Sequence, residues 1–226
     1  MNRNAHVLRP ISFDINMDDL LRHMCIKANS SMAERLIHLA RTAQSIARPK
    51  AAYRLCRLEK KEENRIVVEG ITLSSRILRL NLEKTHRVFV GVATCGCEIA
   101  KWSERFDDTL EKYWVDTLME YALNAANTTL DNDIQSTYRP GQLSSMCPGS
   151  LDDWPVSEQR CVFSLIGEEA RDIGVELLES MLMMPIKSLS RIIFPSETAF
   201  YSCQLCPINK CPSRRVPYDP MSTEYQ

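Results

Sequence analysis

Apolar side chains recur at helical spacing in two long segments of the chain. The first segment starts with the capping-box sequence Ser31-Met-Ala-Glu34, in which a serine and a glutamate satisfy free backbone groups at a helix start. Its apolar positions continue to Arg48-Pro49 and are Leu36, Ile37, Leu39, Ala40, Ala43, Ile46 and Ala47. The second segment starts at Asp108 and carries the stripe Leu110, Trp114, Leu118, Tyr121, Ala122 and Ala125. Both patterns predict amphipathic helices.

Other segments have the branched and apolar content of β-strands. They lie near residues 51–58, 65–69 and 87–94, and further strands are expected at 175–184 and 188–194. The segment RVFVGVAT at 87–94 is apolar enough to be covered on both faces of a sheet. Because the order is mixed and helices cluster early, the pattern predicts an α+β fold.

Composition changes near residue 137. Nine of the eleven prolines lie between Pro140 and Pro220, and five of the nine cysteines follow the same boundary. No internal repeat or low-complexity linker separates the two parts. We therefore expect a single domain over residues 1–226, with an irregular Cys/Pro-rich segment at 200–226.

Charge and composition exclude several classes of protein. The chain has 28 Lys+Arg against 29 Asp+Glu, which argues against nucleic-acid binding through bulk positive charge. It is 44% hydrophobic, enough for a core, yet no apolar run approaches the roughly 20 residues of a membrane span. The N-terminal residues lack the apolar stretch of a secretory signal, and nine cysteines, an odd number, do not suit a disulfide scaffold. We expect a soluble cytoplasmic protein whose thiols are reduced or bind a metal.

A cysteine cluster near the C-terminus has metal-ligand spacing. Cys203, Cys206 and Cys211 form a C-x2-C pair with a third cysteine five residues on, and thiolates of this kind select zinc or an iron–sulfur cluster. Lys210, Arg214 and Arg215 would favour the thiolate forms. The alternative is three small residues in a coil. The fourth ligand stays open among Cys147, Cys161, Cys95, Cys97, a partner, water and a substrate; Cys147 is the working candidate.

Cys95-Gly-Cys97 follows the buried strand and precedes a helical segment. A helix N-terminus would favour a thiolate there, but small residues in a tight strand-to-helix turn explain the sequence equally simply. Cys25 and Cys56 fall in helix and strand patterns, where a thiol usually acts as a small hydrophobe. Glu179 lies between apolar residues and is either exposed or aimed into a pocket.

Several dispersed motifs resemble the activation domain of vitamin B12-dependent methionine synthase. That family has an Arg-Pro-Ala-Pro-Gly-Tyr loop followed by a Thr-Glu-Ser…Met-Trp-Pro…Ser-Val-Ser stretch. The matching positions here are Arg139, Pro148-Gly149, Glu179-Ser180, Pro185 and Ser188-x-Ser190. Further similarity lies in Asp18-Asp-Leu-Leu-Arg22, Ala93-Thr-Cys-Gly and Asp108-Thr-Leu-Glu-Lys-Tyr113, so the resemblance covers about residues 15–200.

The resemblance implies a twisted antiparallel sheet with helices to the side. It also implies a groove that binds S-adenosylmethionine, and docking onto a cobalamin-carrying partner, since the chain has no Asp-x-His-x-x-Gly motif of its own. Arg139 would bind the methionine carboxylate, Pro148-Gly149 would let the backbone approach the ligand, and Glu179 and Tyr201 would face it. Two departures stand out: residues 141–147 separate Arg139 from Pro148, and Ser150 replaces the motif's Tyr.

These observations predict an accessory protein for reductive reactivation of a corrinoid methyltransferase. In this reading a C-terminal metal or iron–sulfur centre at Cys203, Cys206, Cys211 and Cys147 relays an electron to the partner's cobalt. The alternative is a non-catalytic binding module, in which a structural zinc site supports docking to a corrinoid protein without S-adenosylmethionine. A third hypothesis is an enzyme that acts on free corrinoid. It is ranked last because no acid–base pair is visible at motif spacing.

Overall fold

The computed structural model describes residues 4–208, 210–211 and 214–219. Its α-helices are α1 (Met17–His23), α2 (Ser31–Ile46), α3 (Arg76–Asn81), α4 (Cys97–Ser103), α5 (Thr109–Tyr138), α6 (Gln159–Ile166) and α7 (Glu168–Asp172). Its strands are β1 (Ala5–Leu8), β2 (Lys50–Lys61), β3 (Arg65–Val68), β4 (Ile71–Ser74), β5 (Arg87–Thr94), β6 (Leu143–Met146), β7 (Glu176–Leu177), β8 (Met183–Met184) and β9 (Ser188–Pro195). Two 3-10 turns, η1 (Val156–Glu158) and η2 (Ser202–Gln204), complete the order.

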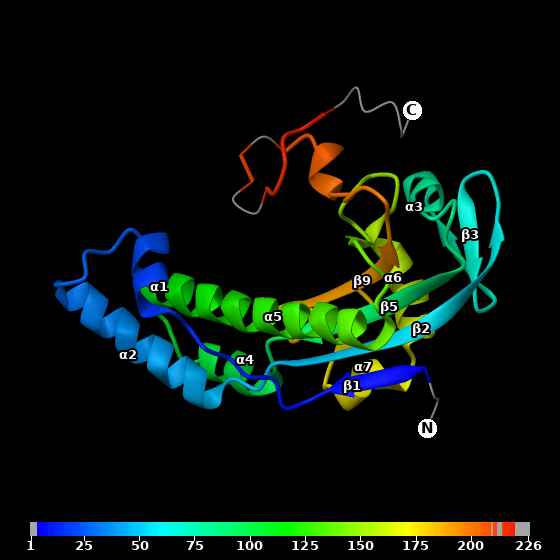
Figure 1. Ribbon diagram of the computed structural model, residues 1–226. Helices are drawn as coiled ribbons and strands as arrows, with labels where there is room; N and C mark the ends of the chain where they lie inside the picture. Colours follow the sequence, from blue (N-terminus) through cyan, green and yellow to red (C-terminus); the bar gives the residue numbers. More distant parts are fainter. Residues whose placement is uncertain (1–3, 209, 212–213, 220–226) are drawn as a thin grey trace.

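Seven strands form one antiparallel sheet in the order β4-β3-β2-β5-β9-β6, with β1 pairing to the first half of β2. The long strand β2 therefore holds β1 and β3 along the same edge and β5 along the other. In β5 every residue after Arg87 is buried, as the apolar sequence predicts. Figure 1 shows the sheet extending from the middle of the molecule towards the β3 hairpin.

Polar side chains cap the N-termini of the two long helices, α2 and α5. Asp108 caps α5 by accepting hydrogen bonds from the backbone N–H groups of Leu110 and Glu111, as predicted. The cap of α2 is Ser30 rather than Ser31, because the Ser30 hydroxyl accepts from the Ala33 N–H. The 30 residues of α5 extend over about 45 Å at 1.5 Å per residue, so this helix spans most of the domain.

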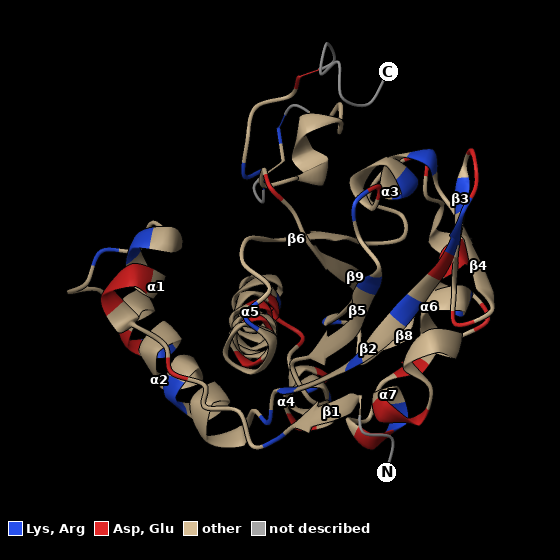
Figure 2. Ribbon diagram, turned by 45° about the vertical axis from the view of Figure 1, so that its right-hand side comes forward, with Lys and Arg blue, Asp and Glu red and all other residues tan. Residues whose placement is uncertain are grey.

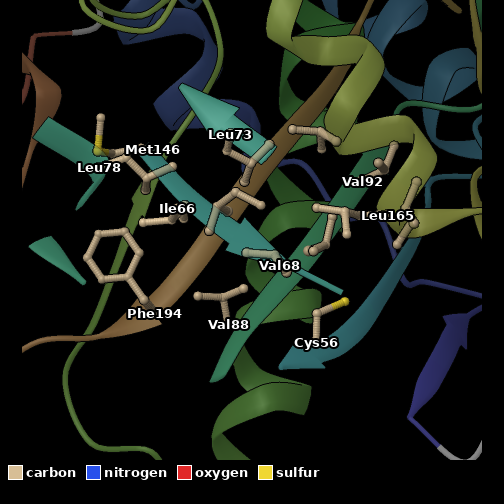
Figure 3. Packing of buried hydrophobic residues seen from close by; sticks show 14 of the residues in the cluster. Cys56, Ile66, Val68, Leu73, Leu78, Val88, Val92, Met146, Leu165 and Phe194 are labelled. Atoms are coloured by element: carbon tan, nitrogen blue, oxygen red, sulfur yellow. The ribbon is translucent and has the colours of Figure 1, made fainter. Parts of the chain in front are cut away.

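Helices cover both faces of the sheet (Figure 2). On one face α5 packs against β2 and β5, through a cluster that includes Tyr53, Phe89, Leu130, Ile134 and Ile193. On the other face α6 and α3 close a larger cluster, part of which Figure 3 shows: Cys56, Ile66, Val68, Leu73, Leu78, Val88, Val92, Met146, Leu165 and Phe194. The alternation along β9 serves both clusters, since Ile192 and Phe194 face one side and Ile193 the other.

A third cluster joins helices to helices beyond the sheet. Residues of α1, α2, α4 and the first half of α5 form it, with Trp102, Trp114 and Leu118 among the buried members. Figure 1 shows α1 and α2 beside the α5 end that lies away from β3. Because α5 contributes to this cluster and to the one on the sheet, a single helix connects the two.

The structure confirms the α+β class, with an antiparallel sheet, flanking helices and an irregular Cys-rich C-terminal region. The predicted strand at 175–184 is wrong. That segment forms the short hairpin β7–β8, where the left-handed Met181 (φ 67°) helps to turn the chain. On the predicted helix stripe, Leu110 is exposed. Within the residues described here, no helix is long and apolar enough to cross a membrane.

Candidate ligand groove

A groove of about 940 Å³ lies between the middle of α5, the edge of the sheet and the C-terminal segment. The α5 wall consists of Glu120, Leu123, Asn124, Asn127, Thr128 and Asp131. The sheet side consists of Leu143, Ser144, Ser145, Cys147 and Ser150 around β6, of Lys187 just before β9, and of Leu189, Arg191 and Ile193 on β9. The third wall is Phe200–Cys203 and Arg215. A volume in this range suits a drug-sized or nucleoside-sized ligand.

Hydrogen bonds to β6 hold the C-terminal wall in place. The Ser144 hydroxyl accepts from the Phe200 N–H at 2.8 Å and lies 2.7 Å from the Ser196 hydroxyl. The Ser196 N–H donates to the Gln142 carbonyl at 2.9 Å. The chain that leaves β9 therefore crosses the edge strand and then borders the groove, as the position of the C-terminal segment above β6 in Figure 2 illustrates.

Opposite charges face each other inside the groove. The Arg191 guanidinium donates to both carboxylate oxygens of Asp131, at 2.7 and 3.3 Å, and its side chain is only 9% exposed. Lys187 pairs with Asp116 of α5 at 2.8 Å. Burial raises the pKa of the Cys147 thiol, and the nearby positive charges of Arg191 and Arg215 partly oppose that rise. The groove thus combines scattered apolar side chains with many polar and charged ones.

Three of the predicted site residues lie in this groove. Tyr201, Cys147 and Cys203 all line it, although they come from two different segments. Pro148 and Gly149 form the turn after β6 between the lining residues Cys147 and Ser150. Gly149 has φ +82°, and an added Cβ would lie 3.2 Å from the Val156 Cβ, so this turn requires glycine.

The structure does not bring Arg139 and Glu179 to the groove. Arg139 is the exposed C-cap of α5, in the left-handed conformation (φ 48°), whereas the groove is lined by residues 120–131 of that helix. Glu179 is exposed in the turn of the β7–β8 hairpin, where its backbone carbonyl accepts a hydrogen bond from Arg160 at 3.4 Å. Both residues meet solvent.

The C-terminal cysteines are partly buried, but their loop is organised by an arginine. Arg214 donates to the backbone carbonyls of Cys203 (2.7 Å), Cys206 (2.8 Å), Ile208 (2.7 Å) and Val216 (3.2 Å). Among the described residues no group of three His, Cys, Asp or Glu side chains is placed to hold a metal ion. The site predicted at Cys203, Cys206, Cys211 and Cys147 therefore stays a prediction; Pro212 and Ser213 lie outside the described residues.

Cys56 and Cys95 are buried packing residues, whereas Cys25, which was expected to act as a small hydrophobe, is exposed. Burial raises the pKa of Cys56 and that of Cys95 to about 12, so both are neutral thiols at physiological pH. Gly96 makes the sharp turn between β5 and α4 with φ +96°, and an added Cβ would lie 2.4 Å from the Arg48 carbonyl oxygen. For Cys95-Gly-Cys97 the structure favours the tight-turn interpretation over an activated Cys95 thiolate.

Sequence reasoning missed the Arg191–Asp131 pair. The available signal was one charged residue inside the otherwise small and apolar strand SLSRIIFP. A second signal was the loop motif of the similar family. In Arg-Pro-Ala-Pro-Gly the arginine precedes the second proline by three residues, which indicates where along this chain the corresponding position lies. Counting back from Pro148 gives Ser145, which lines the groove on β6 opposite Ile193 of β9. Arg191 lies two residues from Ile193 on the same face of the sheet.

The fold and the groove define an α+β domain that carries a ligand-sized groove beside the edge of an antiparallel sheet. No protein-family model matches the sequence, and no curated protein matches it. The structure is similar to a solved one described as the crystal structure of the MetH reactivation domain bound to AdoHcy. The TM-score is 0.64 at 14% sequence identity, and the match covers 87% of this chain and 80% of the other. The likeness establishes the fold.

Proposed function

We propose that this protein binds S-adenosylmethionine or S-adenosylhomocysteine in the groove and serves the reductive reactivation of a cobalamin-dependent methyltransferase. The observation that carries the proposal is the groove itself. It lies in the fold of a domain solved with AdoHcy, and Tyr201 lines it. Pro148-Gly149, which match that family's motif, form the turn between the lining residues Cys147 and Ser150.

The lining suits the parts of such a ligand. Leu123, Leu189 and Ile193 offer apolar surface, and Phe200 and Tyr201 offer aromatic surface for an adenine ring. Serine and asparagine side chains along the same walls can hydrogen-bond a ribose. The protein's own contribution is to hold and orient the methyl donor, while a cobalamin carried by a partner would supply the metal that accepts the methyl group.

Isothermal titration calorimetry of the full chain with S-adenosylhomocysteine tests the proposal. We expect micromolar binding that weakens by about tenfold in Tyr201→Ala, because an aromatic contact contributes about 0.5–1.5 kcal/mol beyond its buried area. Arg139→Ala is the matched control, since Arg139 lies outside the groove, and we expect it to bind as the wild type does. No heat with either S-adenosyl ligand would favour the alternative of a docking module that binds no such ligand.

The partner is a cobalamin-carrying protein in this proposal, and co-elution in gel filtration with a cobalamin-loaded corrinoid protein tests it separately. An electron relay through a C-terminal metal centre is a further prediction from the cysteine spacing. Because the described residues offer no ligand set, the proposed function does not depend on it. Iron, sulfide and zinc analysis after anaerobic purification decides whether such a centre exists.

A further inference from the structure

Arg191 is an unusual residue for its place in the sheet. It lies on β9 between Leu189 and Ile193 on the face that meets α5, and the whole residue is 8% exposed. Its partner across the ladder is Gly91 of β5, which has no side chain to contact the guanidinium. The arginine instead reaches towards α5, where it bonds to Asp131 and, at 3.4 Å, to the Asn127 carbonyl.

Stability alone does not account for this pair. Removing a guanidinium from water is costly, and replacing buried ion pairs by apolar residues of similar size is often neutral or stabilising. Asp131 is also 40% exposed, so water weakens the attraction between the two charges. An ion pair of this kind at the floor of a groove is therefore better explained by a ligand than by the fold.

Two hydrogen-bonding groups beside the pair are left without partners. The Arg191 Nε is buried and has no acceptor, and the Asn127 Oδ1 is buried and has no donor, among the described residues. The Asn127 amide is fixed in this orientation, because its Nδ2 donates to the Leu123 carbonyl at 3.2 Å. Buried polar groups are nearly always paired in folded proteins, so an unused donor next to an unused acceptor points to a missing partner. That partner must accept on one side and donate on the other.

We propose that Arg191, Asp131 and Asn127 recognise the α-amino-acid end of the ligand. The α-carboxylate replaces Asp131 as the acceptor of hydrogen bonds from the Arg191 guanidinium, and the released Asp131 carboxylate and the Asn127 Oδ1 accept from the α-ammonium. This inference rests on the proposed function and names the part of the groove that reads the ligand. It assigns to Arg191 the binding of the α-carboxylate, which the family resemblance had assigned to Arg139.

The other cations of the groove are less suited to this task. Lys187 carries a point charge without the planar pair of donors that a carboxylate fits, and Arg215 is exposed, where water and salt screen its charge. The groove accordingly distinguishes S-adenosylhomocysteine from 5′-methylthioadenosine, which has the same adenosine and thioether but lacks the amino acid. Only the former can use Arg191.

Calorimetry with both compounds on the full chain tests this assignment. We expect Arg191→Gln to weaken S-adenosylhomocysteine by about 30-fold or more, as loss of a buried charged partner does, and 5′-methylthioadenosine by less than about twofold. Arg191→Lys retains the charge but loses the fork, and we expect an intermediate loss. Arg139→Gln is the control, because it removes an exposed cation that lies outside the groove, and we expect both compounds to bind it as they bind the wild type.

The outcomes separate this inference from the proposed function. If both Arg191 variants weaken the two compounds equally, Arg191 only supports the fold and the inference is overturned while the proposed function stands. If the wild type binds neither compound, the proposed function itself fails. Circular dichroism of each variant verifies folding, and should Arg191→Gln not fold, Arg191→Lys gives the same comparison.

Discussion

At the scale of single residues, the buried thiols make stability depend on alkaline pH. Cys56 and Cys95 have pKa values raised to about 12 by burial, whereas a thiol in the unfolded chain ionises near 8.5. The folded state therefore holds protons that the unfolded state loses. Their stabilising contribution is complete below about pH 8.5 and falls as the pH rises towards 12.

We expect each thiol to lower the free energy of unfolding by up to about 1.4 kcal/mol per pH unit in that window. Urea unfolding of the wild type and Cys95→Ala at several pH values measures the effect, and the variant should show the shallower decline. Thr72→Val is the control, because Thr72 is exposed and carries no ionisable group, so the slope should be unchanged. Equal slopes in all three proteins would contradict the prediction.

Gly91 is a second residue with a testable role, because it lets α5 approach the sheet. A Cβ added there would lie 3.1 Å from the Ile193 Cδ1 and 3.3 Å from the Leu130 Cδ1. A valine would overpack this contact, and we expect Gly91→Val to reduce the free energy of unfolding by about 1–3 kcal/mol. Thr72→Val, at an exposed position of β4, should change it by less than about 0.5 kcal/mol in the same chemical denaturation.

At the scale of elements, the C-terminal loop depends on Arg214. One guanidinium bonds to four backbone carbonyls, and hydrogen bonds to charged groups contribute about 1.5–3 kcal/mol each. We expect Arg214→Ala to speed limited proteolysis after Pro195 by about tenfold, and the exposed neighbour Arg215 to tolerate the same change. A metal chelator tests the predicted cysteine site in the same assay, since faster wild-type cleavage with the chelator would support that site.

Long and strongly patterned elements could be predicted from the sequence. The helix α5 was recognisable from Asp108 and its apolar stripe, and β5 from its unbroken apolar run, since both patterns repeat over many residues. The helices α3, α4, α6 and α7 have five to eight residues, which is too short for a period to appear. The segment 175–184 is largely apolar, yet most of it is exposed. It forms a hairpin with two paired residues in each strand, and the left-handed Met181 lies in its turn.

The candidate site was predictable only in part, because some of its residues are distant in the sequence and meet only in the folded chain. The motif residues Tyr201 and Pro148-Gly149 lie at or beside the groove. Arg139 was chosen for its place in the sequence, but the long helix before it carries it past the groove to an exposed end. Arg191 and Asp131 are 60 residues apart, and only the pairing of β9 beneath α5 brings them together.

At the scale of the whole molecule, α5 links the helical cluster to the cluster between α5 and the sheet. Trp102 and Trp114 belong to the helical cluster, and Trp154 belongs to the cluster under α6. We expect the chain to unfold in one transition as a single domain, because α5 enters the helical cluster and the sheet cluster together.

Tryptophan fluorescence can measure this directly. Trp154→Phe leaves two reporters on the helical cluster, and the double variant Trp102→Phe/Trp114→Phe leaves Trp154 on the other side of the sheet. In each variant the fluorescence midpoint in urea should coincide with the midpoint from circular dichroism. Separate midpoints within one variant would show that the helical cluster and the sheet unfold independently, against the single-domain prediction.

The pairing of β5 with β9 has a consequence for how the molecule is made. It joins Thr94 and Ser188, residues 94 positions apart. Closing so large a loop is entropically costly, so contacts of this kind form late in folding and slow it. The helix α5 lies within the loop, and the last wall of the groove follows β9. During synthesis the groove is therefore completed only after β9 and the wall at Phe200–Cys203 have been made, and only from that point can the folded state gain stability from a ligand.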